Sequence, residues 1–243
     1  MEWIVKTGQK VNVELVAHRG ANGEAPENTI SAFNICQVRD IDYVEIDIRS
    51  SLDGVLYNHH DKRLGRTSNG KGLFRLRRSS YIDSLDAGSW FSEDFAGEKI
   101  PRVEDILMAV GKRTKLFFDV KSCNLKKLLS LIKKYEMQDR CFFWFKKEHM
   151  VRSFRKTAPH MALKINCDTP ERLSELKARY NPQIIECHLK NVSNKMVDEC
   201  KNLGLKLMIN YGEYDMERFN KALESGADMI VLDYPVKYLK DLQ

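Results

Sequence analysis

Glu45 and Asp47 stand two positions apart in an apolar run that predicts a buried strand. Residues two apart on a strand share one face, so both carboxylates point the same way. They repel each other unless positive charge lies between them. A hard divalent cation supplies that charge, with Asp119 on a later predicted strand as a third ligand. The alternative is a carboxylate pair neutralised by Arg19 or Lys121.

His18 and His60 flank the two carboxylates in the sequence. Histidine suits proton transfer near neutral pH because its unperturbed pKa is about 6.5. Phosphodiester cleavage requires one group that takes a proton from the nucleophile and another that gives one to the leaving oxygen. The two histidines can fill both roles, while a cation and Arg19 neutralise the non-bridging oxygens. These residue types indicate metal-assisted phosphodiester cleavage.

Short apolar segments rich in β-branched residues alternate with amphipathic segments along the chain, which predicts parallel strands joined by helices. In 243 residues, eight such strands predict an α/β fold, a closed (β/α)8 barrel. In that fold the catalytic side chains lie at the C-terminal ends of the strands. The predicted strands cover residues 14–17, 43–48, 115–120, 141–145, 162–166, 184–188, 206–210 and 228–232. The predicted helices cover residues 27–39, 102–110, 125–135, 147–156, 170–179, 193–203, 215–225 and a last segment from 236.

Residues 49–114 separate the second and third predicted strands, and residues 49–101, which precede the predicted helix 102–110, are far more chain than one crossover helix needs. We expect a single domain over residues 1–243, with this segment inserted over the C-terminal face of the barrel, because long insertions tend to be functional. Within it, residues 55–57 predict a short extra strand. Residues 81–95, which include Trp90, predict a loop or small subdomain over the barrel mouth.

The formal charge of +6 comes from scattered basic residues, one group of which is Arg75, Arg77 and Arg78. Without a dense basic stripe interleaved with aromatic residues, no nucleic-acid partner is expected. The six cysteines form no Cys-x-x-Cys pair, which argues against zinc and against a disulfide scaffold. No apolar run approaches the roughly 18 residues of a transmembrane helix. With no signal-peptide pattern either, a cytoplasmic protein is expected.

The motifs around these residues resemble those of the glycerophosphodiester phosphodiesterase family. Its pattern is matched by His-Arg-Gly at 18–20, Ala-Pro-Glu-Asn-Thr at 25–29, Glu-x-Asp at 45–47, Asp-Gly at 53–54, His-Asp at 60–61, Arg-Thr at 66–67 and Leu-Asp-Tyr-Pro at 232–235. The resemblance covers almost the whole chain. It implies a (β/α)8 barrel of the phosphodiesterase type with a small inserted region. It also implies Mg2+ or Ca2+ as cofactor and hydrolysis of glycerophosphodiesters to glycerol 3-phosphate and an alcohol.

Position by position, the resemblance makes His18 and His60 the acid–base pair. Glu45 and Asp47 become metal ligands, and Arg19 becomes a phosphate contact. Glu27 becomes a supporting residue of the first loop. His59 is then the neighbour of the catalytic histidine, and we expect it to face away and to serve in packing or at the surface.

Two positions depart from the family pattern. Where many relatives have Glu-x-Lys on the third strand, this chain has Asp119 and Lys121. Asp119 is one methylene shorter than glutamate, so we expect the metal to sit closer to that strand or to be reached through water. Lys121 is expected to contact phosphate or carboxylate. A tryptophan common on the seventh strand is also missing from residues 207–211, so the headgroup preference stays open.

Further substrate contacts are expected from Glu186 at the end of the sixth strand, from Trp90 and from Tyr211. The predicted partner is a small-molecule phosphodiester. The sequence leaves open the oligomeric state, the choice between Mg2+ and Ca2+, and the acid and base roles of the two histidines. It also leaves open whether water or the adjacent glycerol hydroxyl is the nucleophile.

Two alternatives remain at this point. One is an enzyme of the same fold that acts on a lysophospholipid or a sugar phosphodiester. The other is a protein that binds phosphodiesters without cleaving them, which is disfavoured because every proton-transfer and metal position has a competent residue.

Overall fold

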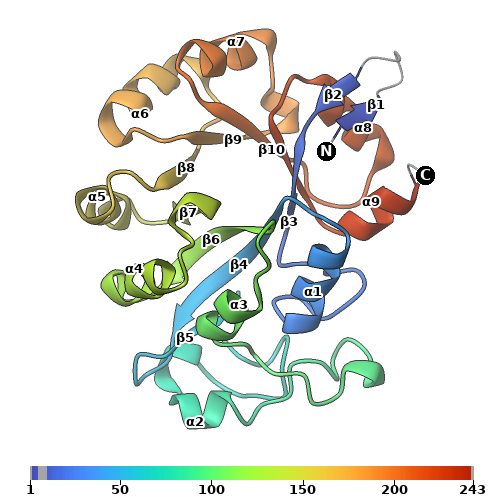
Figure 1. The fold of residues 1–243 in the computed structure, drawn as a ribbon, viewed down its shortest axis with the longest axis vertical. Coiled ribbons are helices and arrows are strands. Elements are labelled where there is room, and N and C mark those ends of the chain that lie inside the picture. The colour runs from blue at the N-terminus through green and yellow to red at the C-terminus, as the bar shows by residue number, and fades with distance from the viewer. Residues whose placement is uncertain (1, 5–9, 242–243) are drawn as a thin grey trace.

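A closed barrel of eight parallel strands forms the centre of the computed structural model, which describes residues 2–4 and 10–241 (Figure 1). Each strand pairs with its neighbour in the chain, and the barrel closes because the first strand pairs with both the last and the second. This arrangement confirms the predicted (β/α)8 fold. The barrel strands are β3 (Glu14–Ala17), β4 (Tyr43–Ser50), β6 (Lys115–Ser122), β7 (Cys141–Phe145), β8 (Ala162–Asn166), β9 (Ile184–His188), β10 (Lys206–Asn210) and β11 (Met229–Leu232).

Helices surround the barrel, in agreement with the amphipathic segments of the sequence (Figure 1). They are α1 (Ile30–Val38), α3 (Val103–Ala109), α4 (Leu125–Lys134), α5 (Glu148–Thr157), α6 (Leu173–Tyr180), α7 (Asn194–Asn202), α8 (Met216–Glu224) and α9 (Pro235–Asp241). Single 3-10 turns cover Phe74–Leu76, Glu93–Phe95, Gln138–Arg140, Pro170–Arg172 and Leu189–Asn191.

The first helix is shorter than predicted. The sequence pattern places its start at Glu27, whereas α1 begins at Ile30. Asn28 adopts a left-handed conformation with φ 61°, which no helical residue has. Thr29 is the N-cap, and its hydroxyl accepts a hydrogen bond from Ala32 N at 3.3 Å. Residues 27 and 28 are therefore free to serve the barrel mouth.

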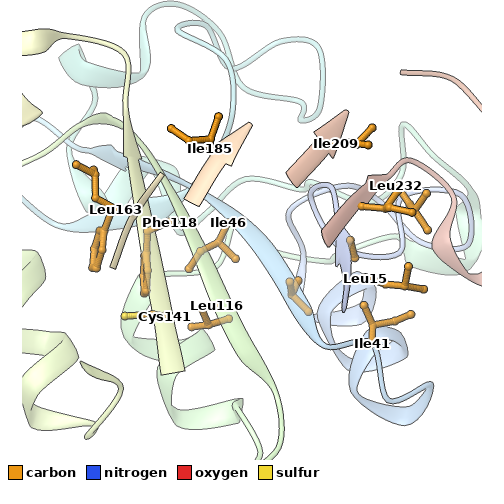
Figure 2. Packing of buried hydrophobic residues seen from close by; sticks show 14 of the residues in the cluster. Leu15, Ile41, Ile46, Leu116, Phe118, Cys141, Leu163, Ile185, Ile209 and Leu232 are labelled. Carbon is orange, nitrogen blue, oxygen red and sulfur yellow. The ribbon is translucent and has the colours of Figure 1, made fainter. Parts of the chain in front are cut away.

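The strands alternate between two apolar layers. Outward-facing side chains such as Ile46, Phe118 and Leu163 pack against the helices in one large cluster (Figure 2). Inward-facing side chains such as Val16 and Phe117 fill the middle of the barrel. This period of two leaves the inner positions near the C-terminal strand ends for polar side chains.

The segment between β4 and α3 forms the insertion, which Figure 1 shows at one end of the molecule beside α1 and α3. Its strand β5 (Leu56–Asn58) lies one residue later than predicted and pairs antiparallel with the end of β4. The insertion also contains α2 (Ser79–Ile82) and a small apolar core of its own, built around Tyr57 and Phe74.

Two short strands, β1 (Glu2–Ile4) and β2 (Lys10–Asn12), form an antiparallel pair that the sequence pattern does not predict. The indole of Trp3 donates a hydrogen bond to Val13 O at 3.2 Å and packs on Phe219. All six cysteines are free thiols. Within residues 2–4 and 10–241, no helix has both the length and the apolar character needed to cross a bilayer.

Candidate active site

Three carboxylates meet inside the barrel near its C-terminal end. Glu45 and Asp47 lie on the inner face of β4, and the register of β4 with β6 places Asp119 directly beside Asp47. One carboxylate oxygen from each of the three residues lies within 4.8 Å of the others, and all three residues are buried. The structure thus brings together the residues predicted to be metal ligands.

Burial and mutual repulsion shape the charges of this cluster. Burial and the neighbouring carboxylates raise the pKa of Glu45 to about 7, and burial likewise raises the pKa of Asp119. Burial also opposes ionisation of Asp47, but nearby cations, Lys121 foremost, lower its pKa. The ammonium of Lys121 lies 2.5 Å from Asp119 Oδ2 and 3.0 Å from Asp47 Oδ1.

The acidic cluster fits a hard divalent cation. Asp119 Oδ1 is buried and accepts no hydrogen bond from the described residues, whereas Asp47 Oδ1 lies 3.0 Å from the Lys121 ammonium. Buried carboxylate oxygens without donors are unfavourable unless a cation compensates them, and an all-oxygen set suits Mg2+ or Ca2+.

His18 follows β3 and faces the acidic cluster. Its Nδ1 lies 2.7 Å from Asp233 Oδ1, and its Nε2 lies 3.4 Å from Glu45 Oε2. Burial lowers the pKa of His18, but the negative charges of Glu45 and Asp233 outweigh that effect and raise it to about 9. Asp233 therefore holds the imidazole at Nδ1, and Nε2 points toward the acidic cluster.

His60 follows β5 and is held in the same manner. Its Nδ1 lies 2.7 Å from Asp61 Oδ1. The backbone of His60 is fixed as well, because its carbonyl accepts two hydrogen bonds from the Arg49 guanidinium. Burial lowers the pKa of His60, although Asp47 and Asp61 act in the opposite direction.

The loop after β3 adopts an unusual backbone that places Arg19 at the mouth. Arg19 has φ 58° and Gly20 has φ 82°. A Cβ on Gly20 would approach Ala32 Cβ to 3.0 Å, so the close contact of this loop with α1 requires glycine. Asn28 N donates to Arg19 O at 3.0 Å, which joins the two left-handed residues. Such conformations persist where the surrounding structure holds them, often at functional sites.

A chain of ion pairs runs from Arg19 around the mouth to Asp61. Arg19 donates to Glu27 Oε1 at 3.0 Å, and Glu27 accepts two hydrogen bonds from Arg66 at 2.6 and 2.8 Å. Arg66 in turn donates to Asp61 Oδ2 at 2.6 Å. The carboxylate that holds His60 is thereby tied to the loop that carries the predicted phosphate contact.

Several residues of this site escaped the sequence reasoning. Asn28 donates to Asp47 Oδ2 at 2.8 Å and so fixes the central carboxylate, while Asn58 accepts from Asp47 N at 2.7 Å and fixes its backbone. Asn28 stands in a motif quoted from the sequence, yet nothing there shows its partner. Asp233 immediately follows the last strand, where barrel enzymes carry functional side chains. Its position directly after a barrel strand could have identified Asp233 as a candidate site residue.

The other predicted substrate contacts, Glu186, Trp90 and Tyr211, interact with residues outside the acidic cluster. Glu186 faces the barrel interior and pairs with the buried ammonium of Lys164. Trp90 is 42% exposed and donates from its indole to Ala87 O at 2.8 Å. Tyr211 packs with its ring against Tyr238. Among the described residues, no hydrogen bond or ring contact joins Trp90 or Tyr211 to the three carboxylates.

His59 faces away from the site, in agreement with the prediction that it serves in packing. It is 3% exposed, stacks on Phe74 with ring centroids 4.9 Å apart, and places Nε2 3.2 Å from Arg63 O. Burial lowers the pKa of His59 to about 4. The neighbouring histidines 59 and 60 are thus divided between the core of the insertion and the mouth.

Two imidazoles beside a carboxylate cluster that could hold a cation suit the hydrolysis of phosphoric diesters, and this (β/α)8 barrel carries them at the C-terminal ends of its strands. Comparison with known proteins identifies the family. Residues 18–181 match the model of the glycerophosphoryl diester phosphodiesterase family. The chain belongs to this family and is a glycerophosphodiester phosphodiesterase.

Individual relatives agree over most of the chain. It is 32% identical over 233 residues to a glycerophosphodiester phosphodiesterase of Caldanaerobacter subterraneus, covering 91% of this chain and 94% of the relative. The crystal structure of a glycerophosphodiester phosphodiesterase from Agrobacterium tumefaciens is similar with a TM-score of 0.87 and 34% identity, covering 92% of this chain and 97% of that one. An Oleispira antarctica phosphodiesterase, solved with the product sn-glycerol-3-phosphate, is similar with a TM-score of 0.85 and 26% identity. That match covers 93% of this chain and 95% of the other.

Proposed function

We propose that the enzyme hydrolyses glycerophosphodiesters to glycerol 3-phosphate and an alcohol in a reaction that depends on a divalent cation. His18 and His60 move the protons. The observation that carries the proposal is the acidic cluster beside two imidazoles, each held at Nδ1 by a carboxylate.

Glu45, Asp47 and Asp119 would hold Mg2+ or Ca2+, and the bound cation supplies positive charge to the phosphate oxygens. Lys121 and Arg19 add to that charge from the chain itself. The guanidinium of Arg19 can donate to two oxygens at once, and its buried Nε makes no hydrogen bond among the described residues, although it lies 3.6 Å from Asp47 Oδ2.

The histidines act through Nε2. Their Nδ1 partners Asp233 and Asp61 have lowered pKa values, so both carboxylates are ionised and only accept hydrogen bonds. The Nδ1 atoms of His18 and His60 must therefore carry hydrogen, which leaves the Nε2 atoms for proton transfer. One Nε2 takes the proton of the nucleophile and the other donates a proton to the departing alkoxide. Attack by water gives the products in one step, whereas attack by the adjacent glycerol hydroxyl expels the alcohol and leaves a cyclic phosphate that water must then open to glycerol 3-phosphate; the same two histidines can serve either route.

The support for a glycerol group in the substrate comes from the relatives. Two of them carry the name glycerophosphodiester phosphodiesterase, and the Oleispira enzyme was solved with sn-glycerol-3-phosphate as its product. We further propose that residues 1–243 act as one barrel domain whose insertion, residues 49–101, lies over the C-terminal face. His60 and Arg66 of the insertion support this placement because they take part in the network at the mouth. The cytoplasmic location and the contacts of Trp90 and Tyr211 stay predictions.

Activity measurements test the cation dependence and the substrate class. Glycerophosphocholine and glycerophosphoethanolamine should be hydrolysed, EDTA should abolish turnover, and Mg2+ or Ca2+ should restore it. Lysophosphatidylcholine and a sugar phosphodiester, assayed in parallel, should react more slowly. Full activity in EDTA contradicts the cation dependence, and faster cleavage of either parallel substrate contradicts the substrate class.

Single variants test the histidines. His18→Ala and His60→Ala should each lose turnover by at least the roughly 10²–10⁴-fold typical of a general acid or base, with unchanged circular dichroism. The exposed His160 provides the control, and His160→Ala should keep wild-type activity. Substantial residual hydrolysis in both active-site variants contradicts the assignment.

A further inference from the structure

The part of the insertion that follows the mouth is strongly basic. Residues 62–82 contain seven lysines and arginines and no aspartate or glutamate. Arg66 belongs to the network at the mouth, and Arg77 donates to Lys71 O at 3.0 Å. The other cations form what we call the basic face: Lys62, Arg63, Lys71, Arg75 and Arg78.

The basic face has no carboxylate partners among the described residues. All five of its side chains are exposed, and none lies within ion-pair distance of an acidic group there. The acidic residues nearby are already engaged. Asp53 accepts from two serine hydroxyls, Asp61 pairs with Arg66, and Asp83 pairs with Arg102. The charge of this face is therefore uncompensated.

Backbone contacts hold the segments that carry the basic face next to one another. Residue 63 bridges antiparallel to residue 73, and Phe74 N donates to Lys62 O at 2.9 Å. The turn between β4 and β5 joins the same surface, because Leu52 N donates to Arg77 O at 2.8 Å. This turn exposes 54% of Leu52, and the adjoining 3-10 turn exposes 51% of Leu76. Two large exposed apolar side chains thus belong to the segments that carry or adjoin the unpaired cations.

From this combination we propose that the basic face docks the enzyme on an anionic phospholipid surface. The negative surface potential of an anionic bilayer attracts lysine and arginine side chains. Insertion of exposed leucines into the interface adds a favourable free energy because it removes apolar area from water. The face begins one residue after Asp61, so docking would bring the mouth of the barrel close to the membrane. A nucleic acid is the less favoured partner, because no exposed aromatic ring in residues 62–82 offers a base a stacking platform.

Vesicle flotation tests the proposal with the whole protein. The wild type should float with equimolar phosphatidylglycerol–phosphatidylcholine vesicles at low salt, but not with pure phosphatidylcholine, and high salt should release it. The triple variant Lys71→Gln, Arg75→Gln, Arg78→Gln should bind the anionic vesicles more weakly by roughly fivefold for each charge, on the order of a hundredfold in all. Leu76→Ser should also weaken binding but keep its salt dependence.

A matched triple variant controls for net charge. Lys133→Gln, Lys156→Gln and Lys201→Gln remove three exposed lysines from barrel helices and should leave flotation unchanged. Both triple variants should hydrolyse glycerophosphocholine at the wild-type rate, which shows that they are folded. The proposal is overturned by any one of three results. These are no binding of the wild type to anionic vesicles, equal losses in the two triple variants, or tighter retention of the wild type by a DNA duplex than by the vesicles.

Discussion

Asp233 and His18 are 215 residues apart in the chain, and Asp233 Oδ1 lies 2.7 Å from His18 Nδ1. The parallel pairing of β11 with β3 brings these strand ends level. Asn22 donates a second hydrogen bond to the same carboxylate oxygen at 2.8 Å. Closure of the barrel therefore completes the environment of the first histidine.

Replacement of Asp233 by asparagine should lower kcat while KM changes little. An amide can donate to Nδ1 and so favours the tautomer with hydrogen on Nε2, which cannot act as a base. A comparable change beside a catalytic histidine lowers kcat by roughly 10⁴-fold, so we expect a loss of about 10²–10⁴-fold. Steady-state kinetics across pH should also show a shifted profile. Wild-type kcat and an unmoved pH profile in Asp233→Asn would contradict this role, and Asp241→Asn serves as the control.

Metal binding should stabilise the wild type and leave carboxylate variants nearly unaffected. At a hundred times Kd a ligand adds about 2.7 kcal/mol, or roughly 5–10 °C in Tm for a chain of this size. Asp119→Asn should respond far less to Mg2+. In EDTA the same variant should be more stable than the wild type, because burial and Asp47 raise the pKa of Asp119 and the amide removes that repulsion. Equal Tm shifts with Mg2+ in both proteins would refute the ligand assignment. Glu224→Gln, on the outer surface, provides the control.

The Lys164–Glu186 pair should matter more for stability than surface pairs do. Its side chains are 4% and 11% exposed, and the ammonium lies 5.0 Å from the ring centroids of both Phe117 and Trp144. Glu186→Gln leaves a buried charge unpaired, which costs about 3–5 kcal/mol. Methionine at both positions should recover most of this loss in urea denaturation.

An exposed ion pair gives the matched comparison for this effect. Lys195 and Glu171 are 66% and 58% exposed, so Glu171→Gln should change the free energy of unfolding by less than about 1 kcal/mol. If Glu186 also contacts substrate, KM of the Glu186→Gln variant should rise in addition. A Glu186→Gln variant as stable as the wild type would show that the buried pair contributes nothing.

The sequence predicts the barrel well because its signals are local. Period-two apolar runs mark strands such as β4, and they also predict that Glu45 and Asp47 face inward, as the outer packing of Ile46 confirms. The start of α1 could not be predicted this way. The left-handed Asn28 owes its position to the side chain of Asp47, a contact that exists only in the folded barrel.

Pairings between elements that are distant in the chain could likewise not be predicted from the sequence. No local pattern connects Lys164 with Glu186, or Asp233 with His18, before the strand register is known. Tyr211, which directly follows β10, packs against Tyr238 of α9, and this contact too joins segments that only the fold brings together.

Below neutral pH, His59 should make the folded enzyme less stable. Burial lowers its pKa to about 4, whereas the unfolded chain has a histidine pKa of about 6.5. Between these two pKa values the unfolded state binds more protons than the folded state. The stability that comes from keeping His59 neutral is therefore fully present above pH 6.5 and is lost as the pH falls toward 4. It amounts to at most about 3 kcal/mol. Urea denaturation should show a smaller loss from about pH 7 to about pH 5 in His59→Gln than in the wild type. His160→Gln, an exposed control, should keep the wild-type pH dependence, and an identical slope in His59→Gln would rule out His59 as its source.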